Sequence, residues 1–260
     1  MNEFNIEVAG GNSVRLPTAG KYCDRDILVT ATGGDTDAAY QQGFADGKKY
    51  HNDAFWYLYQ IGGARTNYEN AFAGMGWTDN LFKPQYDIKP EGNLYMCFRK
   101  SGITDLVAAL EKQGVVFDVS AVTNMTYAFY NSGITHIGVL DCSNVTNASN
   151  FSNCFISCTK LVTIDKIKLA TTSGTFTNVF DNTPMLENIT FEGEINRNGL
   201  SFGSSTKLTH ASLMSIVGAL ADYSEDTSGT SWVLTLGTAN LEKLSDAEKA
   251  IATEKGWTLV

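Results

Sequence analysis

The stretch from residue 125 to 164, MTYAFYNSGITHIGVLDCSNVTNASNFSNCFISCTKLVTI, decides the fold because it contains one pattern twice. In each copy a large apolar residue stands four positions before a phenylalanine, and a small residue stands directly before it. The two phenylalanines are Phe129 and Phe155, and each is followed by a polar break and a short apolar run. A unit of this size cannot cover its own apolar face, so neighbouring copies must stack.

The pattern continues on both sides of this stretch. The anchor phenylalanines are Phe72, Phe98, Phe129, Phe155, Phe180 and Phe202, at intervals of 26, 31, 26, 25 and 22 residues. The residues four positions before the first five anchors are Tyr68, Leu94, Met125, Phe151 and Phe176. Apolar residues at positions -4, -1 and 0 share one side of a short helical turn, and the apolar runs that follow predict short strands, beginning for example at Ile103 and Ile134. The sequence therefore predicts an α/β repeat, a leucine-rich-repeat-like solenoid of short helices and short strands over residues 68–207.

A second repeated phrase supports this register. Asp118–Asn124 (DVSAVTN) matches Asp141–Asn147 (DCSNVTN) at an offset of 23 residues. Asp, Asn and Ser side chains bond readily to backbone groups at chain corners. We expect these phrases to form the turns between successive units.

The chain before the repeats has two parts. Residues 1–34 are predicted to be a small β unit, because apolar and polar residues alternate over residues 4–8 and 14–16 and a β-rich run follows at 26–30. Residues 35–67 are predicted to be a helix and linker. The apolar stripe within residues 37–60 either packs on its own domain or brings copies of the chain together, because the spacing suits both.

Residues 208–260 are predicted to close the apolar end of the stack. We expect a helix over 208–220, a strand over 232–236 and a second helix after the Ser245–Glu248 capping-box pattern. Gly256 should end that helix, and a last short strand should follow at 257–260.

Composition and charge exclude several classes of protein. The 260 residues carry 19 basic and 28 acidic side chains, a formal net charge of -9, which argues against a nucleic-acid partner. No apolar run approaches the ~20 residues of a membrane-spanning helix, so no membrane insertion is expected. The first residues lack the basic and apolar regions of an export signal. Five cysteines without metal-type spacing predict reduced, buried thiols.

Residues for catalysis or cofactor binding do not gather in the sequence. His51, His136 and His210 lie far apart without metal-type spacing, and no nucleophile, phosphate-loop or dinucleotide motif occurs. We therefore expect no metal, no cofactor and no enzyme activity. An enzyme on a repeat scaffold is kept as a remote alternative.

The repeats resemble BspA-like leucine-rich-repeat proteins, which are common in gut bacteria. The resemblance rests on Asn153-Cys154-Phe155, on Leu161-Val162-Thr163-Ile164 and on the two Asp-x-Ser-x-Val-Thr-Asn phrases, and it spans residues 68–208. The segment 236–257 is similar to the ending of many such proteins. The segment 19–30 is similar to a short β segment of prophage tail-associated proteins. The resemblance implies a recognition or adhesion surface and carries no catalytic residues.

Two kinds of protein fit this expected binding surface. The first is a non-catalytic protein associated with a phage or prophage tail, made in the bacterial cytoplasm and located in the virion, which binds a protein or glycan on a cell surface. The alternative is a secreted bacterial adhesin at the cell surface.

The binding surface is predicted from the strand alternation. Residues between the core-facing ones should project from the strands and form one polar strip. The candidates are Asp105, His136, Thr163, Asp165, Asn188 and Thr190, with Glu192 at the end. A shift of one residue in register would turn every one of these side chains inward.

Overall fold

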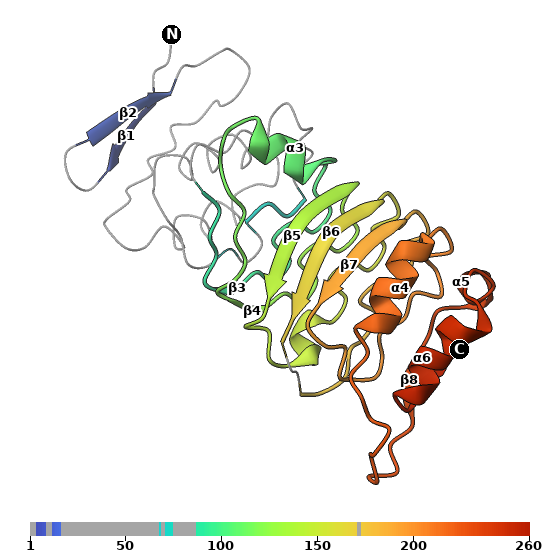
Figure 1. Ribbon diagram of the computed structural model, residues 1–260. Helices are drawn as coiled ribbons and strands as arrows, with labels where there is room; N and C mark the ends of the chain where they lie inside the picture. The colour runs from blue at the N-terminus through green and yellow to red at the C-terminus, as the bar shows by residue number, and fades with distance from the viewer. Residues whose placement is uncertain (1–3, 9–11, 17–67, 69–70, 75–86, 171–172) are drawn as a thin grey trace. The chain divides into compact units, whose positions relative to one another are not determined.

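The structure is a computed structural model that describes residues 4–8, 12–16, 68, 71–74, 87–170 and 173–260 (Figure 1). The chain forms two compact units, residues 1–63 and 64–260. In the first unit β1 (Phe4–Val8) pairs antiparallel with β2 (Asn12–Leu16), at the positions that the alternation predicts. The predicted strand at 26–30 and the predicted helix and self-association segment at 37–60 lie outside the described residues.

The strands described in the second unit are short and pair in parallel. The strands β5 (His136–Cys142), β6 (Thr163–Leu169) and β7 (Asn188–Glu192) form one parallel sheet in that order, with α4 (His210–Gly218) beside β7 (Figure 1). Two further parallel pairs are β3 (Gly92–Asn93) with β4 (Val122–Asn124) and β8 (Trp232–Leu234) with β9 (Trp257–Leu259). The other elements among the described residues of this unit are α3 (Leu106–Glu111), η1 (Ala148–Phe151), α5 (Thr238–Leu241) and α6 (Asp246–Glu254).

The anchor phenylalanines form one column of stacked rings through the core. The rings of Phe72, Phe98, Phe129, Phe155, Phe180 and Phe202 follow one another at centroid distances of 5.0, 5.2, 5.3, 5.2 and 4.8 Å. All six side chains are fully buried, and the apolar residues four positions before the first five are buried as well. The spacing in the sequence therefore identified the core residues of this unit.

The segments around the anchors are mostly turns where short helices were predicted, and only the 3-10 helix η1, which ends at Phe151, precedes an anchor in the described residues. Turns occupy residues 95–100, 126–131, 152–157 and 179–182. Non-glycine residues with positive φ stand two positions before and two after four of the anchors; they are Met96, Lys100, Tyr127, Asn131, Asn153, Ser157, Asn178 and Asn182. A left-handed residue interrupts right-handed helical winding, so a helix cannot pass through these positions.

The backbone N–H groups of these turns bond alternately to their own unit and to the next one. Within a unit, for example, the N–H of Cys97 donates to the carbonyl of Leu94 at 3.1 Å. The N–H of Phe98 donates to the carbonyl of Ala128 at 2.6 Å, and the N–H of Phe129 donates to that of Cys154 at 2.9 Å. The N–H of Phe155 donates to the carbonyl of Val179 at 3.0 Å. This pairing satisfies the buried backbone without helices. The solenoid with its leucine-rich-repeat-like character stays a prediction.

The long unit between Phe98 and Phe129 contains a helix that the sequence did not predict. The strand expected to begin at Ile103 is absent from the described residues apart from a single parallel bridge between Asp105 and His136. Directly after the bridge, the Asp105 carboxylate accepts a hydrogen bond from the N–H of Ala108 at 2.9 Å and so caps α3.

The repeated phrases form the corners that were predicted. The carboxylate of Asp118 accepts from the N–H of Ser120 at 2.9 Å, and that of Asp141 accepts from the N–H of Ser143 at 3.1 Å. The last residue of each phrase does the same, since Asn124 and Asn147 accept from the N–H two residues later at 3.0 and 2.9 Å. Each phrase therefore stabilises two turns.

The C-terminal segment has the predicted elements. The helix α4 starts after the capping residue Thr209, and α6 starts at a complete capping box between Ser245 and Glu248. Gly256, at φ 80°, follows α6 and leads into β9. The Lys255 ammonium donates to the carbonyls of Gly218 and Leu220, both at 2.7 Å, and so joins the end of α4 to the end of α6. Four cysteines, Cys97, Cys142, Cys154 and Cys158, are free and buried, as expected.

Candidate functional site

Four of the predicted strip residues lie in one row across the parallel strands. Asp105 pairs with His136, His136 with Thr163, and Thr163 with Asn188. Register partners in a sheet point to the same face. The residues that follow the last three are Ile137, Ile164 and Ile189, and all are buried, so the row faces outward.

His136 lies between two carboxylates from different units. Its Nδ1 is 3.4 Å from Oδ1 of Asp105, and its Nε2 is 3.0 Å from Oδ1 of Asp165. The three side chains are 29%, 37% and 47% exposed. At this exposure the pairs contribute little to stability, so their main effect is to fix the orientation of the imidazole ring.

An irregularity in β6 widens the outward face. The register between β6 and β7 shifts between Ile164 and Ile167, and both of these residues are buried. Asp165 and Lys166 therefore both lie on the outer side, where strict alternation would have turned Lys166 inward. Thr190 is exposed on β7 between two buried residues, as predicted.

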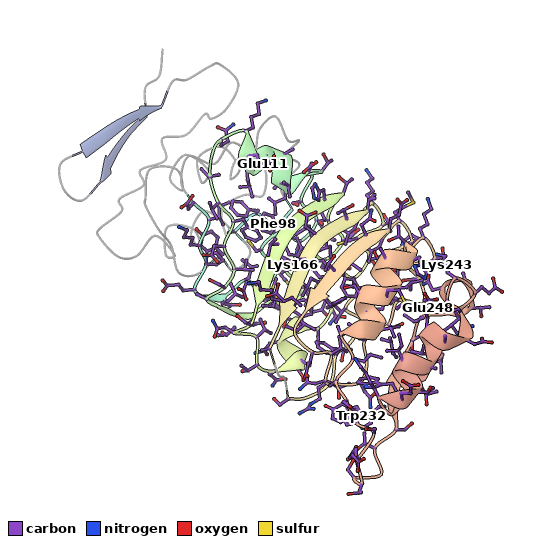
Figure 2. All side chains as sticks on the ribbon, in the orientation of Figure 1. Phe98, Glu111, Lys166, Trp232, Lys243 and Glu248 are labelled. Carbon is purple, nitrogen blue, oxygen red and sulfur yellow. The ribbon has the colours of Figure 1, made fainter. Side chains whose placement is uncertain are left out.

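The other end of the same face carries a network of ion pairs that the sequence analysis missed. The Lys166 ammonium is 2.7 Å from Glu192, and the Lys168 ammonium is 3.4 Å from Asp141 and 3.6 Å from Glu192 (Lys166 is labelled in Figure 2). The hydrogen bond from Lys166 lowers the pKa of Glu192 below its usual range. The signal was present in the sequence, because Asp141, Lys168 and Glu192 are register partners once the strands are aligned.

A shallow polar hollow of about 290 Å³ opens beside the row. It is lined by Thr163, Ile164, Asp165, Asn188, Ile189, Thr190, Thr209, Ala211 and Ser212, and so includes four of the six predicted residues. The Thr209 hydroxyl at the start of α4 donates to the Asn188 side-chain oxygen at 3.4 Å. The Ser212 hydroxyl oxygen accepts from the N–H of Ile189 at 3.0 Å and thereby ties α4 to β7. Hydroxyl, amide and carboxylate groups thus surround the hollow.

Among the described residues, no group of three or more His, Cys, Asp or Glu side chains is arranged to hold a metal ion. None of the helices in the described part of the chain is long and apolar enough to cross a membrane.

Comparison with known proteins adds no relative. No protein-family model, no curated protein and no solved structure matches the chain. The function is therefore inferred from the chain's own residues.

Proposed function

We propose that this chain is a non-catalytic recognition protein that binds a protein or glycan through the outer face of β5, β6 and β7. The observation that carries the proposal is the row of Asp105, His136, Thr163 and Asn188. These side chains come from four successive parallel segments, which places hydrogen-bonding groups at the strand spacing of about 4.8 Å. Such a row suits an extended ligand held by several weak hydrogen bonds.

The hollow beside the row supports the same proposal. It is shallow and offers the hydroxyls of Thr163, Thr190 and Thr209 together with the Asn188 amide. These groups can both donate and accept, which is what the hydroxyls of a sugar or the backbone of a peptide require. Water can bridge the remaining gaps in an open site of this kind.

The setting of His136 favours binding over catalysis. Both ring nitrogens lie against carboxylates, at 3.4 and 3.0 Å, so neither faces an open position for a substrate proton. A ring held in this way presents its edge as a fixed contact. An enzyme on a repeat scaffold stays the remote alternative.

The location of the protein is part of the proposal and rests on the sequence. The segment 19–30 is similar to a β segment of prophage tail-associated proteins, which favours a tail-associated recognition protein. A secreted adhesin is the alternative. Fractionation of uninduced bacterial host cells separates the two, because a tail protein should be absent from their surface and an adhesin should be present.

The experiment that tests the binding surface uses three substitutions made together, His136→Ala, Thr163→Ala and Asn188→Ala. A matched control carries Thr177→Ala and Asp181→Ala, which change exposed side chains near Phe180 and leave the strands untouched. The unmodified chain is first tested against bacterial cell-wall glycans and whole candidate host cells. The strip variant should then bind the selected target at least about tenfold more weakly, because the hydrogen bonds of Thr163 and Asn188, of about 1 kcal/mol each, are lost together with the edge contact of His136. The control should bind as the unmodified chain does. Unchanged affinity of the strip variant, with an unchanged circular dichroism spectrum and Tm, would show that the ligand binds elsewhere.

A further inference from the structure

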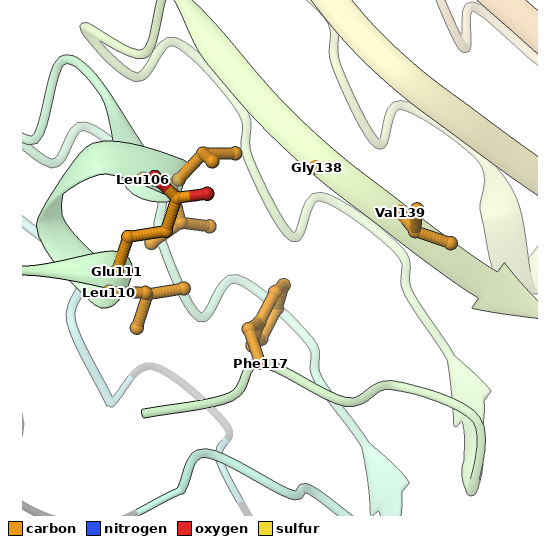
Figure 3. A pocket seen from close by; sticks show the side chains of 7 residues that line it. Leu106, Leu110, Glu111, Phe117, Gly138 and Val139 are labelled. Carbon is orange, nitrogen blue, oxygen red and sulfur yellow. The ribbon is translucent and has the colours of Figure 1, made fainter. Parts of the chain in front are cut away.

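A second, apolar hollow lies on the same side of the molecule, between α3 and β5 (Figure 3). Its volume is about 110 Å³, which is small for a whole ligand and of the size that one side chain occupies. The lining residues are Leu106, Val107, Leu110, Glu111, Phe117, Gly138 and Val139. Val139, in the middle of β5, is 49% exposed and forms part of this apolar lining.

Gly138 keeps this hollow open. A Cβ at this position would lie 3.2 Å from Cγ2 of Val107 and 4.0 Å from Oδ2 of Asp165. The backbone of Gly138 does not have the positive φ that favours glycine, so the residue is not required by its conformation. The missing side chain instead leaves a gap between α3 and the Asp165 carboxylate. Asp165 thus stands between the apolar hollow and the polar hollow described above.

Carboxylate groups lie at the border of this apolar hollow. Glu111 projects from α3 among the apolar side chains of the hollow in Figure 3. Asp165 borders the hollow next to Gly138, and its Oδ1 contacts His136. Asp105 contacts the other ring nitrogen of the same histidine. Two lysines are near in the fold: Lys112 follows Glu111 at the exposed end of α3, and Lys166 is the register partner of Val139, with its ammonium engaged by Glu192 at 2.7 Å. The field at the hollow therefore favours a positive group.

We propose that this hollow binds the side chain of a lysine or arginine on a protein partner. The aliphatic stem would pack on Leu106, Leu110 and Val139, and the cationic head would lie between the Glu111 and Asp165 carboxylates. Lysine and arginine bury their stems on apolar surface while the charged end stays in contact with water or a carboxylate. Charge complementarity with a chain of net charge -9 selects a basic partner. This inference rests on the proposed recognition function and names the ligand class as a basic protein segment.

The test uses nuclear magnetic resonance on the full chain with two small probes. The first is Nα-acetyl-lysine methylamide, and the second is the uncharged Nα-acetyl-norleucine methylamide, which has an apolar chain of similar length. The lysine probe should shift the amide resonances of Gly138 and Val139 in a saturable way. The norleucine probe should bind there at least threefold more weakly, because it gains the apolar contact without the charge.

Glu111→Gln and Glu254→Gln give the matched variants, since both change an exposed glutamate to its neutral isostere at the end of a helix. Glu111→Gln should remove the preference for lysine, and Glu254→Gln should preserve it. Equal binding of the two probes to the unmodified chain would overturn the inference, and so would shifts that miss Gly138 and Val139. Either result leaves the proposed function standing if the strip variant still loses its target. If the strip variant bound its target with unchanged affinity while the lysine probe still bound at Gly138 and Val139, only the proposed strip would be rejected.

Discussion

Phe98 and Phe129 stack with their rings within 1° of parallel and their centroids 5.2 Å apart, although 31 residues separate them. The next pair, Phe129 and Phe155, is separated by 26 residues and has nearly the same spacing, 5.3 Å. The extra residues lie outside the column, in α3 and the segment that follows it. The ring spacing is therefore set by the hydrogen bonds between neighbouring units, whose strands lie about 4.8 Å apart, rather than by the length of the connection.

The column predicts a large loss of stability when one ring is removed. Phe129 contacts rings on both sides and is fully buried, so Phe129→Ala should lower the free energy of unfolding by about 3–5 kcal/mol. Urea denaturation followed by circular dichroism measures this loss. The control is Phe117→Ala, which removes a half-buried ring that meets Phe98 edge to face at 5.7 Å, and it should cost clearly less. Equal costs would mean that the column is not the main packing element.

The sequence predicted the core of the repeats better than their backbone conformation. Apolar residues at positions -4, -1 and 0 identified buried side chains, because burial follows spacing in a helical turn and in the observed turn alike. The spacing could not separate these two conformations. The remaining signal was the asparagines two positions from the anchors, such as Asn153 and Asn178, because asparagine tolerates positive φ better than most residues.

For the candidate surface, the sequence predicted the outward-facing row but not the bulge or the helix α3. Strand alternation placed His136, Thr163 and Asn188 on one outer row, because each is followed directly by a buried isoleucine that fixes the register. It could not place Lys166, since a bulge depends on the pairing with the next strand. The helix α3 was missed because it has six residues, and its main local signal is the capping residue Asp105.

The left-handed positions predict a stabilising substitution. Lys100 is exposed and has φ 55°, a conformation that costs a residue with a Cβ about 1–2 kcal/mol. Lys100→Gly should therefore raise the free energy of unfolding by up to about 1 kcal/mol, after the greater freedom of glycine in the unfolded chain is subtracted. Lys112→Gly is the matched control, because Lys112 is also exposed and has φ -59° at the end of α3. The control should lower stability by about 0.5–1 kcal/mol. A loss in both variants would contradict the role of positive φ at Lys100.

The buried thiols predict slow chemical modification. Burial raises the pKa of Cys158 to about 11 and raises those of Cys97, Cys142 and Cys154 well above the usual range. The thiolate is the reactive form, so these four residues should resist a disulfide reagent at pH 8 in the folded chain. The measurement uses a Cys23→Ser variant, because Cys23 lies outside the described residues. The reaction should become fast only in urea, at the concentration that unfolds the protein. A thiol that reacts within the mixing time without urea would contradict the buried setting.

The corner at Asp141 predicts a dependence of stability on pH. The hydrogen bond from the Ser143 hydroxyl, at 2.6 Å, lowers the pKa of Asp141, and the Ser143 N–H and Lys168 act in the same direction. A carboxyl whose pKa is lower in the folded chain than in the unfolded one stabilises the fold above its ordinary pKa of about 3.9, and the contribution is lost as the pH falls through the folded pKa.

Asp141→Asn keeps an oxygen that can accept from the Ser143 N–H and removes the charge. The variant should therefore be less stable than the unmodified chain at pH 7, and the difference should shrink as the pH falls from 5 to 3, because the carboxyl of the unmodified chain becomes neutral as well. Urea midpoints at pH 7, 5 and 3 measure both chains. Asp181→Asn, an exposed change in the turn that follows Phe180, controls for the loss of one negative charge. A difference at Asp141 that stays constant over this range would mean that the carboxylate charge does not stabilise the corner.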